Sequence, residues 1–295
     1  MVLNVNDLFV GHHGGAIMRK VGLVLKRGHT QALALAEKIS LLLSELGKEI
    51  LVEESFCDLP ESWGIHPCKN IADEADLIVA LGGDGTILRV AALLNDRPVP
   101  VLGVNLGRVG FLAEISPEEA CSELQSALEG KSILAQRMML EATLPDHQKI
   151  KVLNEVVIHW SGVARIIDIL LKLGATRDIE LRADGVIVAT PLGSSAYSYA
   201  ANGPLVHPNV EAMMITPICA YFGLTRPLIL PADRSIELVL QRGETFKVTI
   251  DGRLSADLEL GDTIGIRKSS IPFIIIKSRT RGYFEALEAK LGLVG

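Results

Sequence analysis

The sequence predicts two domains, an α/β domain built on a parallel sheet and a β-rich domain of stacked sheets. Up to about residue 131, short apolar runs alternate with helical stretches, which is typical of a Rossmann-like parallel sheet. From there to residue 278 the chain is mostly short β-like runs separated by turn signals. We therefore expect an α/β domain at 20–131 and a β-rich sandwich domain at 132–278. The last segment, 279–295, contains a helix-like stretch at 283–291 that we expect to return to the first domain.

Composition limits the classes of function. The chain of 295 residues is long enough for two domains, and its 48% hydrophobic but 4% aromatic content predicts aliphatic cores. A net charge of −6 argues against a broad nucleic-acid surface, which would need a basic excess. The four cysteines form no C-x-x-C pair, so reduced thiols are favoured over zinc or disulfides. Neither a signal-peptide layout nor an apolar run of the roughly 18 residues that span a membrane is visible, so we expect a cytoplasmic protein.

The first domain shows strands and helices in alternation. A strand at 21–25 precedes a helix with Gly47 as its C-terminal stop. The apolar stripe of this helix consists of Leu35, Ile39, Leu42 and Leu46. Further short strands are expected at 50–52, 77–81 and 100–104, with an irregular connection at 53–75.

Two features flank this alternation. A capping box, Ser116-Pro117-Glu118-Glu119, opens a helix that ends near Gly130. Residues 1–19 have no clear period, and we favour a loose extension there over a metal site at His12 and His13.

A glycine-rich segment, Gly82-Gly83-Asp84-Gly85-Thr86, joins the central strand to a helix that reads from Thr86 to Leu94. Glycines let a ligand approach the backbone, and the N–H groups at a helix start attract anions, so this is a candidate phosphate loop. An acid there repels phosphate, which makes sense if Asp84 binds a metal or takes a proton from a hydroxyl. The alternative is a tight turn with glycines for steric reasons. Ligands of parallel sheets bind beyond the carboxyl ends of the strands, where Asp84 is expected.

A second glycine-bearing loop follows the strand at 100–104. It reads Asn105-Leu106-Gly107-Arg108-Val109-Gly110-Phe111-Leu112. Its spacing differs from the dinucleotide motif G-x-G-x-x-G, and the chain has no G-x-x-x-x-G-K-[ST] motif either.

The β-rich half is read from nine short runs. They are residues 139–144, 152–159, 166–173, 179–181, 186–189, 236–240, 246–250, 263–266 and 273–276. Arg242-Gly243, Asp251-Gly252 and Gly261-Asp262 are turn signals between them.

Polar clusters interrupt these strands. Neighbouring strand residues point to opposite faces, so Asn154 and Glu155 share a pocket only at a strand end or a bulge. A carboxylate there could accept two hydrogen bonds from a ribose diol, and the amide could read an adenine edge. The alternative is a turn beside a solvated edge. Arg182-Ala183-Asp184-Gly185 could likewise be an Asp-Gly turn and nothing more.

The segment from Thr190 to Pro204 is dense in hydroxyls and small residues. Small residues leave room, hydroxyls adapt their hydrogen bonds, and Tyr197 offers a flat face for stacking. We favour a ligand-binding role over a structural linker.

Together these motifs resemble those of NAD kinases in order and spacing, from about residue 21 to the end. The motifs are Gly82-Gly83-Asp84-Gly85-Thr86, Asn105…Gly107…Gly110-Phe111-Leu112, Leu153-Asn154-Glu155-Val156, and Asp184-Gly185…Thr190-Pro191-Leu192-Gly193-Ser194-Ser195-Ala196-Tyr197…Gly203-Pro204. The glycine loop alone is shared with lipid kinases, whereas the Asn-Glu pair together with the long Thr-Pro segment is far more restrictive.

The resemblance implies that the protein phosphorylates the 2′-hydroxyl of the adenosine ribose of NAD to give NADP, with ATP as co-substrate and a divalent ion such as Mg²⁺. It implies that Asp84 is the general base. The implied NAD-binding residues are Asp84, Gly85, Arg89, Asn154, Glu155, Arg165, Arg182, Asp184, Ser195, Ala196, Tyr197 and Ser198. The implied phosphate-donor loop is Gly82, Gly83, Gly85 and Thr86. Members of this family are homodimers or homotetramers with sites near the subunit contact.

Three departures from the family pattern bear on donor preference, the choice between NAD and NADH, and regulation. Leu192 stands where the family commonly has Thr, Ala220-Tyr221-Phe222 replaces a Pro-His-Ser sequence, and Arg253 stands where Gln is common. The sequence leaves ATP and polyphosphate as alternative donors. Two other classes are weighed against the NAD kinase: a lipid kinase with the same loop, which would want an acyl channel or a basic membrane-facing patch, and a non-catalytic dinucleotide sensor, in which Asp84 would have no purpose.

Overall fold

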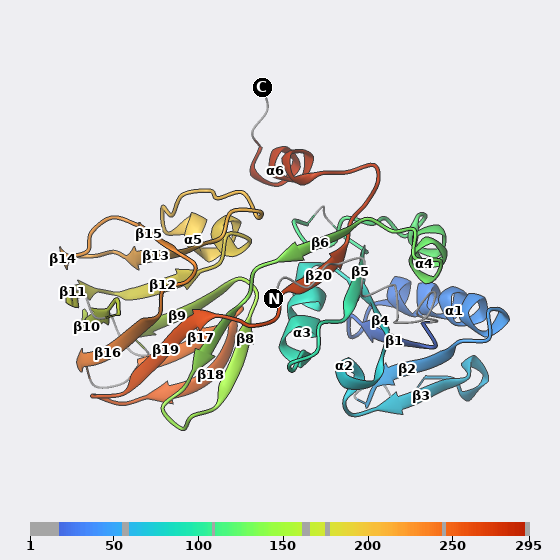
Figure 1. The fold of residues 1–295 in the computed structure, drawn as a ribbon, viewed down its shortest axis with the longest axis horizontal. Coiled ribbons are helices and arrows are strands. Elements are labelled where there is room, and N and C mark those ends of the chain that lie inside the picture. Colours follow the sequence, from blue (N-terminus) through green and yellow to red (C-terminus); the bar gives the residue numbers. More distant parts are fainter. Residues whose placement is uncertain are drawn as a thin grey trace. The chain divides into compact units, whose positions relative to one another are not determined.

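The computed structural model describes residues 18–54, 59–107, 110–160, 166–174, 178–243 and 246–292. It forms two compact units (Figure 1). The first takes the chain up to Gln136 and again from Phe273, and the second runs from Arg137 to Pro272. His12, His13 and Arg165 lie outside the described residues.

The first unit is built on one sheet in the order β3-β2-β1-β4-β5-β20-β6. These strands are β1 Lys20–Leu25, β2 Glu49–Glu53, β3 Ile65–Cys68, β4 Leu77–Gly82, β5 Pro100–Asn105, β6 Leu134–Arg137 and β20 Phe273–Ile276. The neighbours from β3 to β20 pair in parallel. Since β4 and β5 are buried at every position, they read as continuous apolar runs rather than as alternating ones.

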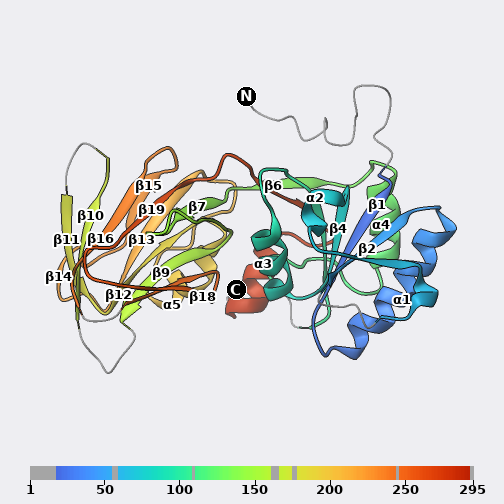
Figure 2. The same cartoon turned by 90° about the horizontal axis from the view of Figure 1, so that it is seen from below.

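Helices cover both faces of this sheet (Figure 2). They are α1 Thr30–Glu45, α2 Ile71–Glu74, α3 Asp84–Leu93 and α4 Ala120–Leu128. A further helix of this unit, α6 Tyr283–Leu291, follows β20. Apolar residues of α1 and α4 share one core with the strands. On the other face, a Cβ at Gly22 would meet Ile71 of α2 and one at Gly103 would meet Ile87 of α3, so α2 and α3 pack closely there.

The helix-end signals in the sequence are confirmed. Gly47 has a positive φ of 64°, and it donates its N–H to Ser44 while Lys48 donates to Leu43, which closes the last turn of α1. At the start of α4, Ser116 and Glu119 exchange side-chain to backbone hydrogen bonds as a capping box does.

The predicted α/β and β-rich architecture is confirmed, but the placement of one strand is wrong. Residues 273–276 were expected in the β-rich half, whereas β20 pairs in parallel with β5 in the first sheet. The connection at 53–75 also contains β3 and α2, which the sequence reading missed. The final helix spans the predicted 283–291, and its Phe284 side chain is exposed.

The second unit contains two sheets, and the strand pairs that the structure describes in them are antiparallel. Their orders are β14-β11-β10-β16-β19-β7-β8 and β15-β13-β12-β9-β17-β18. The strands are β7 Leu140–Thr143, β8 Lys149–Val152, β9 Glu155–Trp160, β10 Ile167–Lys172, β11 Asp178–Ala183, β12 Gly185–Ala189, β13 Ala212–Ile218, β14 Phe222–Gly223, β15 Leu228–Pro231, β16 Ile236–Arg242, β17 Phe246–Ile250, β18 Arg253–Leu258 and β19 Thr263–Lys268.

An aliphatic core joins the inner faces of the two sheets, with Phe246 as its large aromatic residue. The segment that carries the short 3₁₀ helix η4 Gly193–Ser195 and α5 Tyr197–Ala200 packs near the other face of β12 and β13, where Ala201 and Val206 contact buried strand residues. The strand expected at 152–159 is divided: β8 ends at Val152 and β9 begins at Glu155. Asn154 and Glu155 therefore lie at a strand end, the condition under which they can serve one pocket.

Candidate active site

The Gly-Gly-Asp-Gly segment lies where the central parallel strand becomes a helix. β4 ends at Gly82, Gly83 is the N-cap, and Asp84 is the first residue of α3. A Cβ on Gly82 would lie 2.0 Å from the Thr86 hydroxyl, so the close strand-to-helix turn requires glycine at this position. Gly83 and Gly85 have open space where a Cβ would be, which leaves the helix start accessible to a ligand.

The Asp84 carboxylate is held by three successive backbone amides. Phe111 donates to Oδ2 at 3.0 Å, and Leu112 and Ala113 donate to Oδ1 at 3.0 and 3.2 Å. A Cβ on Gly110 would lie 2.1 Å from Oδ1, so the absence of a side chain at this position permits the contact. The structure thus brings together the two glycine loops that the sequence reading had treated separately.

A cation from the end of the chain completes this cluster. The Lys290 ammonium lies 3.0 Å from Asp84 Oδ2 and 4.6 Å from the centre of the Phe111 ring. Tyr283, at the start of the same helix, packs on that ring with centroids 6.2 Å apart. The first unit therefore presents an anchored carboxylate, a helix N-terminus and an ammonium in one place.

Arg89, one turn further along α3, uses its guanidinium inside the first unit. It donates to the carbonyl of Leu25 at 2.6 Å and lies 3.1 Å from the Glu53 carboxylate. Leu25 and Glu53 are the last residues of β1 and β2, so Arg89 ties α3 to the carboxyl edge of the sheet. Its predicted contact with NAD remains a prediction.

In the second unit, the Asn154-Glu155 corner is fixed by Asp251. This carboxylate accepts the N–H groups of Leu153 at 3.0 Å, Asn154 at 2.7 Å and Glu155 at 3.2 Å. Asp251 has a φ of 49°, a left-handed conformation that Asp tolerates in turns. Burial raises the pKa of Asp251 although the three amides and Arg253 oppose the shift.

Thr190 and Gly193 hold the same corner from another element. The Thr190 hydroxyl donates to the Leu153 carbonyl at 2.6 Å, and its N–H donates to the Asn154 carbonyl at 2.8 Å. A Cβ on Gly193 would lie 2.2 Å from the Asn154 carbonyl oxygen, so glycine is needed for this approach. The Asn-Glu and Thr-Pro motifs are therefore parts of one structure.

Glu155 carries the clearest sign of an incomplete site. Its side chain is 5% exposed, and its Oε2 is buried without a hydrogen-bond partner in the described part of the chain. Burial and then the charge of Asp251 raise the pKa of Glu155 to about 7, while the Tyr197 N–H opposes the shift. A buried acceptor without a donor is costly, and a ligand that donates hydrogen bonds would relieve that cost.

The hydroxyl-rich segment divides into surface and interior residues. The Tyr197 side chain is 47% exposed and available for stacking, and Ser195 and Ala196 are partly exposed. Ser198 is fully buried, with its hydroxyl 2.9 Å from that of Thr216. The Ser198 hydroxyl is therefore used inside the unit, and the predicted contact of this residue with NAD stays a prediction.

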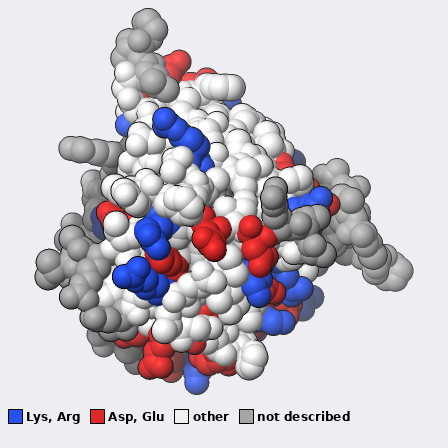
Figure 3. All heavy atoms as spheres, turned by 90° about the vertical axis from the view of Figure 1, so that its left-hand side faces the viewer, with Lys and Arg blue, Asp and Glu red and all other residues white. Residues whose placement is uncertain are grey.

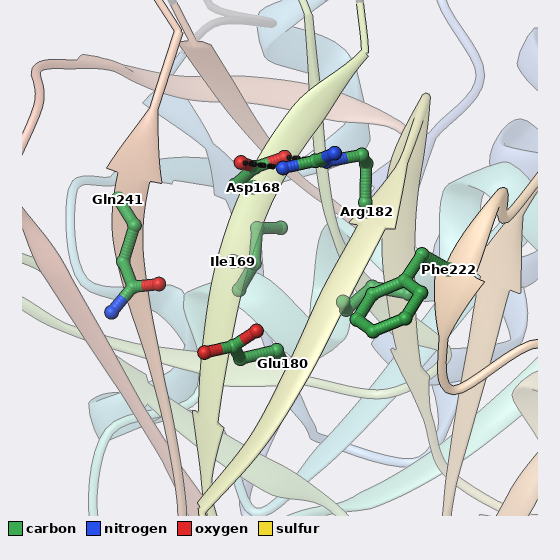
Figure 4. Close-up of a pocket in the computed structure, with 7 residues that line it drawn as sticks. Asp168, Ile169, Glu180, Arg182, Phe222 and Gln241 are labelled. Carbon is green, nitrogen blue, oxygen red and sulfur yellow. Dashed lines mark hydrogen bonds and ion pairs between the residues drawn. The ribbon is translucent and has the colours of Figure 1, made fainter.

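Arg182 and Asp184 lie away from this corner within their own unit. β12 starts after Asp184, and its far end, Ala189, pairs with Glu155, so about five strand residues, or roughly 17 Å, separate the two ends. Arg182 pairs with Asp168 through two hydrogen bonds of 2.8 and 2.9 Å. Arg182 and Asp168 line a groove of about 400 Å³ on the sheet, together with Phe222 (Figure 4).

The three departures from the family pattern occupy different environments. Leu192 is buried, so its apolar side chain packs rather than offering a hydroxyl. Tyr221 and Phe222 are exposed at the edge strand β14, and Arg253 is exposed where β18 begins.

Sequence reasoning missed several residues around Asp84 and around the Asn154-Glu155 corner. The amides of residues 111–113 carry no side-chain signal, and Lys290 is 206 residues from Asp84 along the chain. Asp251 was read only as a turn residue, although an Asp-Gly pair directly after an apolar strand was a usable signal for a carboxylate at a sheet end.

Figure 3 shows basic and acidic side chains interspersed over the described residues of the face in view. Within the described ranges, no group of three or more His, Cys, Asp or Glu residues is placed to hold a metal ion. Among those same residues no helix is long and apolar enough to cross a membrane.

Comparisons with known proteins show the family to which the chain belongs. Family models of the ATP-NAD kinase N-terminal and C-terminal domains match residues 21–132 and 153–278. The NAD kinase of Syntrophotalea carbinolica is 37% identical over 281 residues, covering 93% of this chain and 99% of that protein. An Archaeoglobus fulgidus NAD kinase solved with ATP has a TM-score of 0.72 and 29% identity, covering 94% of this chain and 100% of that one. Yeast NADH kinase solved with NADH shares the fold, with a TM-score of 0.87 at 24% identity, covering 95% of this chain and 89% of that one. The chain therefore belongs to the ATP-NAD kinase family.

Proposed function

We propose that the protein transfers the terminal phosphoryl group of ATP to the 2′-hydroxyl of the adenosine ribose of NAD and releases NADP and ADP. The observation that carries the assignment of the reacting group is the Asp84 carboxylate, anchored by three amides beside an accessible helix start. Membership of the family supports the choice of substrates, and the geometry around Asp84 supports the choice of the reacting group.

In the proposed reaction, the ribose hydroxyl donates to Asp84 and attacks the phosphorus in line with the leaving ADP. The bond from the ribose oxygen to phosphorus forms as the bond to ADP breaks, and the hydroxyl proton passes to Asp84. Phosphoryl transfer depends chiefly on positioning and charge neutralisation. The rigid amide anchor favours positioning, because it holds the carboxylate in one place before substrate arrives.

A divalent ion such as Mg²⁺ would supply charge neutralisation at the phosphates. Mg²⁺ is usually held by substrate phosphates and one or two carboxylates, and it keeps several waters. We therefore propose that the ion arrives with ATP. Gly82, Gly83, Gly85 and Thr86 would form the loop that the phosphates approach, since the positions of Gly83 and Gly85 are open.

The second unit would bind NAD. Among the described residues no donor reaches the buried Glu155 Oε2, which suits a ribose hydroxyl, and the exposed Tyr197 ring suits stacking. Asn154, Ser195 and Ala196 line the same corner of the unit and would complete the contact.

The position of Arg182 and Asp184 supports a homodimer or a homotetramer. They lie at the other end of the unit from Glu155, so we propose that they serve the site of a partner subunit. We also place the enzyme in the cytoplasm, since Cys68, Cys121 and Cys219 are free thiols. The relatives give no support to a lipid kinase or to a non-catalytic sensor.

The test is mass detection of NADP after the protein is mixed with NAD, Mg²⁺ and either ATP or polyphosphate, with NADH, a diacylglycerol and a sphingoid base as alternative acceptors. We expect NADP to form with ATP. Phosphorylation of a lipid in place of NAD, or of no acceptor at all, would refute the assignment.

A further inference from the structure

The Asp84 carboxylate has no place left for a substrate hydroxyl. Oδ1 accepts the N–H groups of Leu112 and Ala113, and Oδ2 accepts the N–H of Phe111 and the ammonium of Lys290. An ionised carboxylate offers about four lone-pair sites. A ribose hydroxyl can therefore donate to Asp84 only after one of these four donors has left.

Lys290 is the donor that can leave. The three amides belong to one backbone segment that packs directly against Asp84, with Gly110 making room for it. Lys290 is a flexible side chain, 40% exposed, in the last turn of α6. The Phe111 ring, 4.6 Å from the ammonium, gives this cation a second favourable neighbour and keeps it beside the site.

We propose that Lys290 is a phosphate-binding residue of the transfer reaction. In the resting protein its ammonium neutralises Asp84, and when the ribose hydroxyl takes its place, the ammonium passes to the phosphoryl group of ATP. This inference rests on the proposed function. It also resolves the difficulty that an acid in a phosphate loop repels phosphate, because the acid comes with its own cation.

The order of bond formation in the proposed reaction fits this exchange. The hydroxyl oxygen that donates to Asp84 is the atom that attacks the phosphorus, so the phosphoryl oxygens arrive next to the position that Lys290 occupies. Negative charge in the transition state is spread over those oxygens. A lysine ammonium is a compact charge with three donors, so it can move between a carboxylate and a phosphoryl group without losing its hydrogen bonds.

The experiment compares Lys290→Met and Lys290→Arg with wild type in steady-state kinetics. We expect Lys290→Met to lower kcat/KM for ATP by about 10- to 100-fold, as loss of a charged hydrogen bond does, and to leave the KM for NAD unchanged. Lys290→Arg should recover part of the loss. The control is Lys131→Met, which removes a lysine that pairs with Glu129 on the surface of the same unit and should match wild type.

Calorimetric titration with Mg²⁺ and inorganic tripolyphosphate isolates the phosphate contact. We expect Lys290→Met to weaken tripolyphosphate binding, and to do so equally when Asp84→Asn is also present. Loss of the effect in the Asp84→Asn background would mean that Lys290 acts only through Asp84, and would overturn the proposal. Wild-type or raised activity in Lys290→Met would overturn it too, as would equal losses for ATP and NAD with a lowered Tm.

The two hypotheses fail in different ways. Wild-type protein that forms no NADP refutes the proposed function. Wild-type protein that forms NADP while Lys290→Met behaves identically refutes only the role of Lys290.

Discussion

Two aspartates, one in each unit, are anchored in the same way and differ in their surroundings. Asp84 accepts three successive amides from residues 111–113, and Asp251 accepts three successive amides from residues 153–155. Asp251 is 5% exposed, and burial raises its pKa. The Asp84 side chain is 23% exposed and has an ammonium beside it.

Under the proposed function Asp84 is the reactive carboxylate and Asp251 a structural one, so their surroundings must account for the difference. Three amides fix the position of either group, so anchoring alone does not distinguish them. Exposure to a ligand and a movable counter-ion do, because a substrate must reach the carboxylate and replace one of its partners. Asp251 instead shapes the backbone that carries Asn154 and Glu155. The comparison predicts that mutations at Asp84 change turnover and that mutations at Asp251 change stability.

The largest effect is expected for Asp84→Asn. An amide cannot take the proton of the ribose hydroxyl, and general-base assistance is typically worth ~10²–10⁴-fold, so kcat should fall by about that factor. NAD should still bind, because most of the proposed NAD contacts lie in the second unit. Single-turnover NADP formation and NAD titration measure the two quantities.

Asp146→Asn is the matched control for this variant. Asp146 accepts the N–H of Gln148 in an exposed turn, a bond that Asn can also make, so kcat should not change. Equal turnover in Asp84→Asn and wild type would remove the assignment of Asp84 as the base.

A large loss of stability is expected for Asp251→Ala. Two buried amides and one half-buried amide would lose their acceptor at a cost of about 1–3 kcal/mol each, partly offset because a buried carboxylate is no longer present, so we expect a net loss of about 3 kcal/mol. Urea unfolding followed by circular dichroism measures it. Asp262→Ala, which removes the acceptor for one exposed turn amide, should cost under about 1 kcal/mol. Comparable losses in the two variants would contradict the structural role of Asp251.

Local patterns in the sequence predicted the structural elements whose formation depends on residues close together in the chain. The strand, glycines and helix around Asp84, the Gly47 stop and the 283–291 helix all follow from spacing and backbone preference. The position of β20 does not, because four apolar residues read alike in a parallel sheet and in a sandwich. Pairings across long stretches of chain, such as Asp84 with Lys290 and Asp251 with residues 153–155, cannot be read from local patterns, because a local pattern can mark a polar residue but does not identify its partner.

Glu155→Gln tests how the Asp251 corner responds to pH. Burial and the charge of Asp251 raise the pKa of Glu155 from 4.5 to about 7, so between these values the folded state binds more protons than the unfolded state. Its contribution therefore lowers stability as pH rises through this window, by about 3 kcal/mol in full above pH 7. Glu155→Gln should remove that dependence and raise the Tm at pH 8, while it weakens NAD binding.

Melting curves from pH 5 to 8, with and without NAD, measure this effect. Glu237→Gln, an exposed carboxylate on β16, is the control and should follow wild type throughout. Parallel curves for wild type and Glu155→Gln would contradict the raised pKa. Tighter NAD binding in the variant would contradict the proposed hydrogen bonds from the ribose.

The smallest effect, and the one that separates anchoring from exposure, is expected for Gly110→Ala. Its Cβ would lie 2.1 Å from Asp84 Oδ1, so the carboxylate must shift while it keeps its charge and its exposure. Misplacement of a reacting group should lower kcat by about tenfold with little change in NAD affinity. Gly107→Ala is the control, because its Cβ would lie 3.9 Å from Asn105, an ordinary contact. If Gly110→Ala turns over as fast as Gly107→Ala, the amide anchor is dispensable, and exposure with the nearby cation is all that distinguishes Asp84 from Asp251.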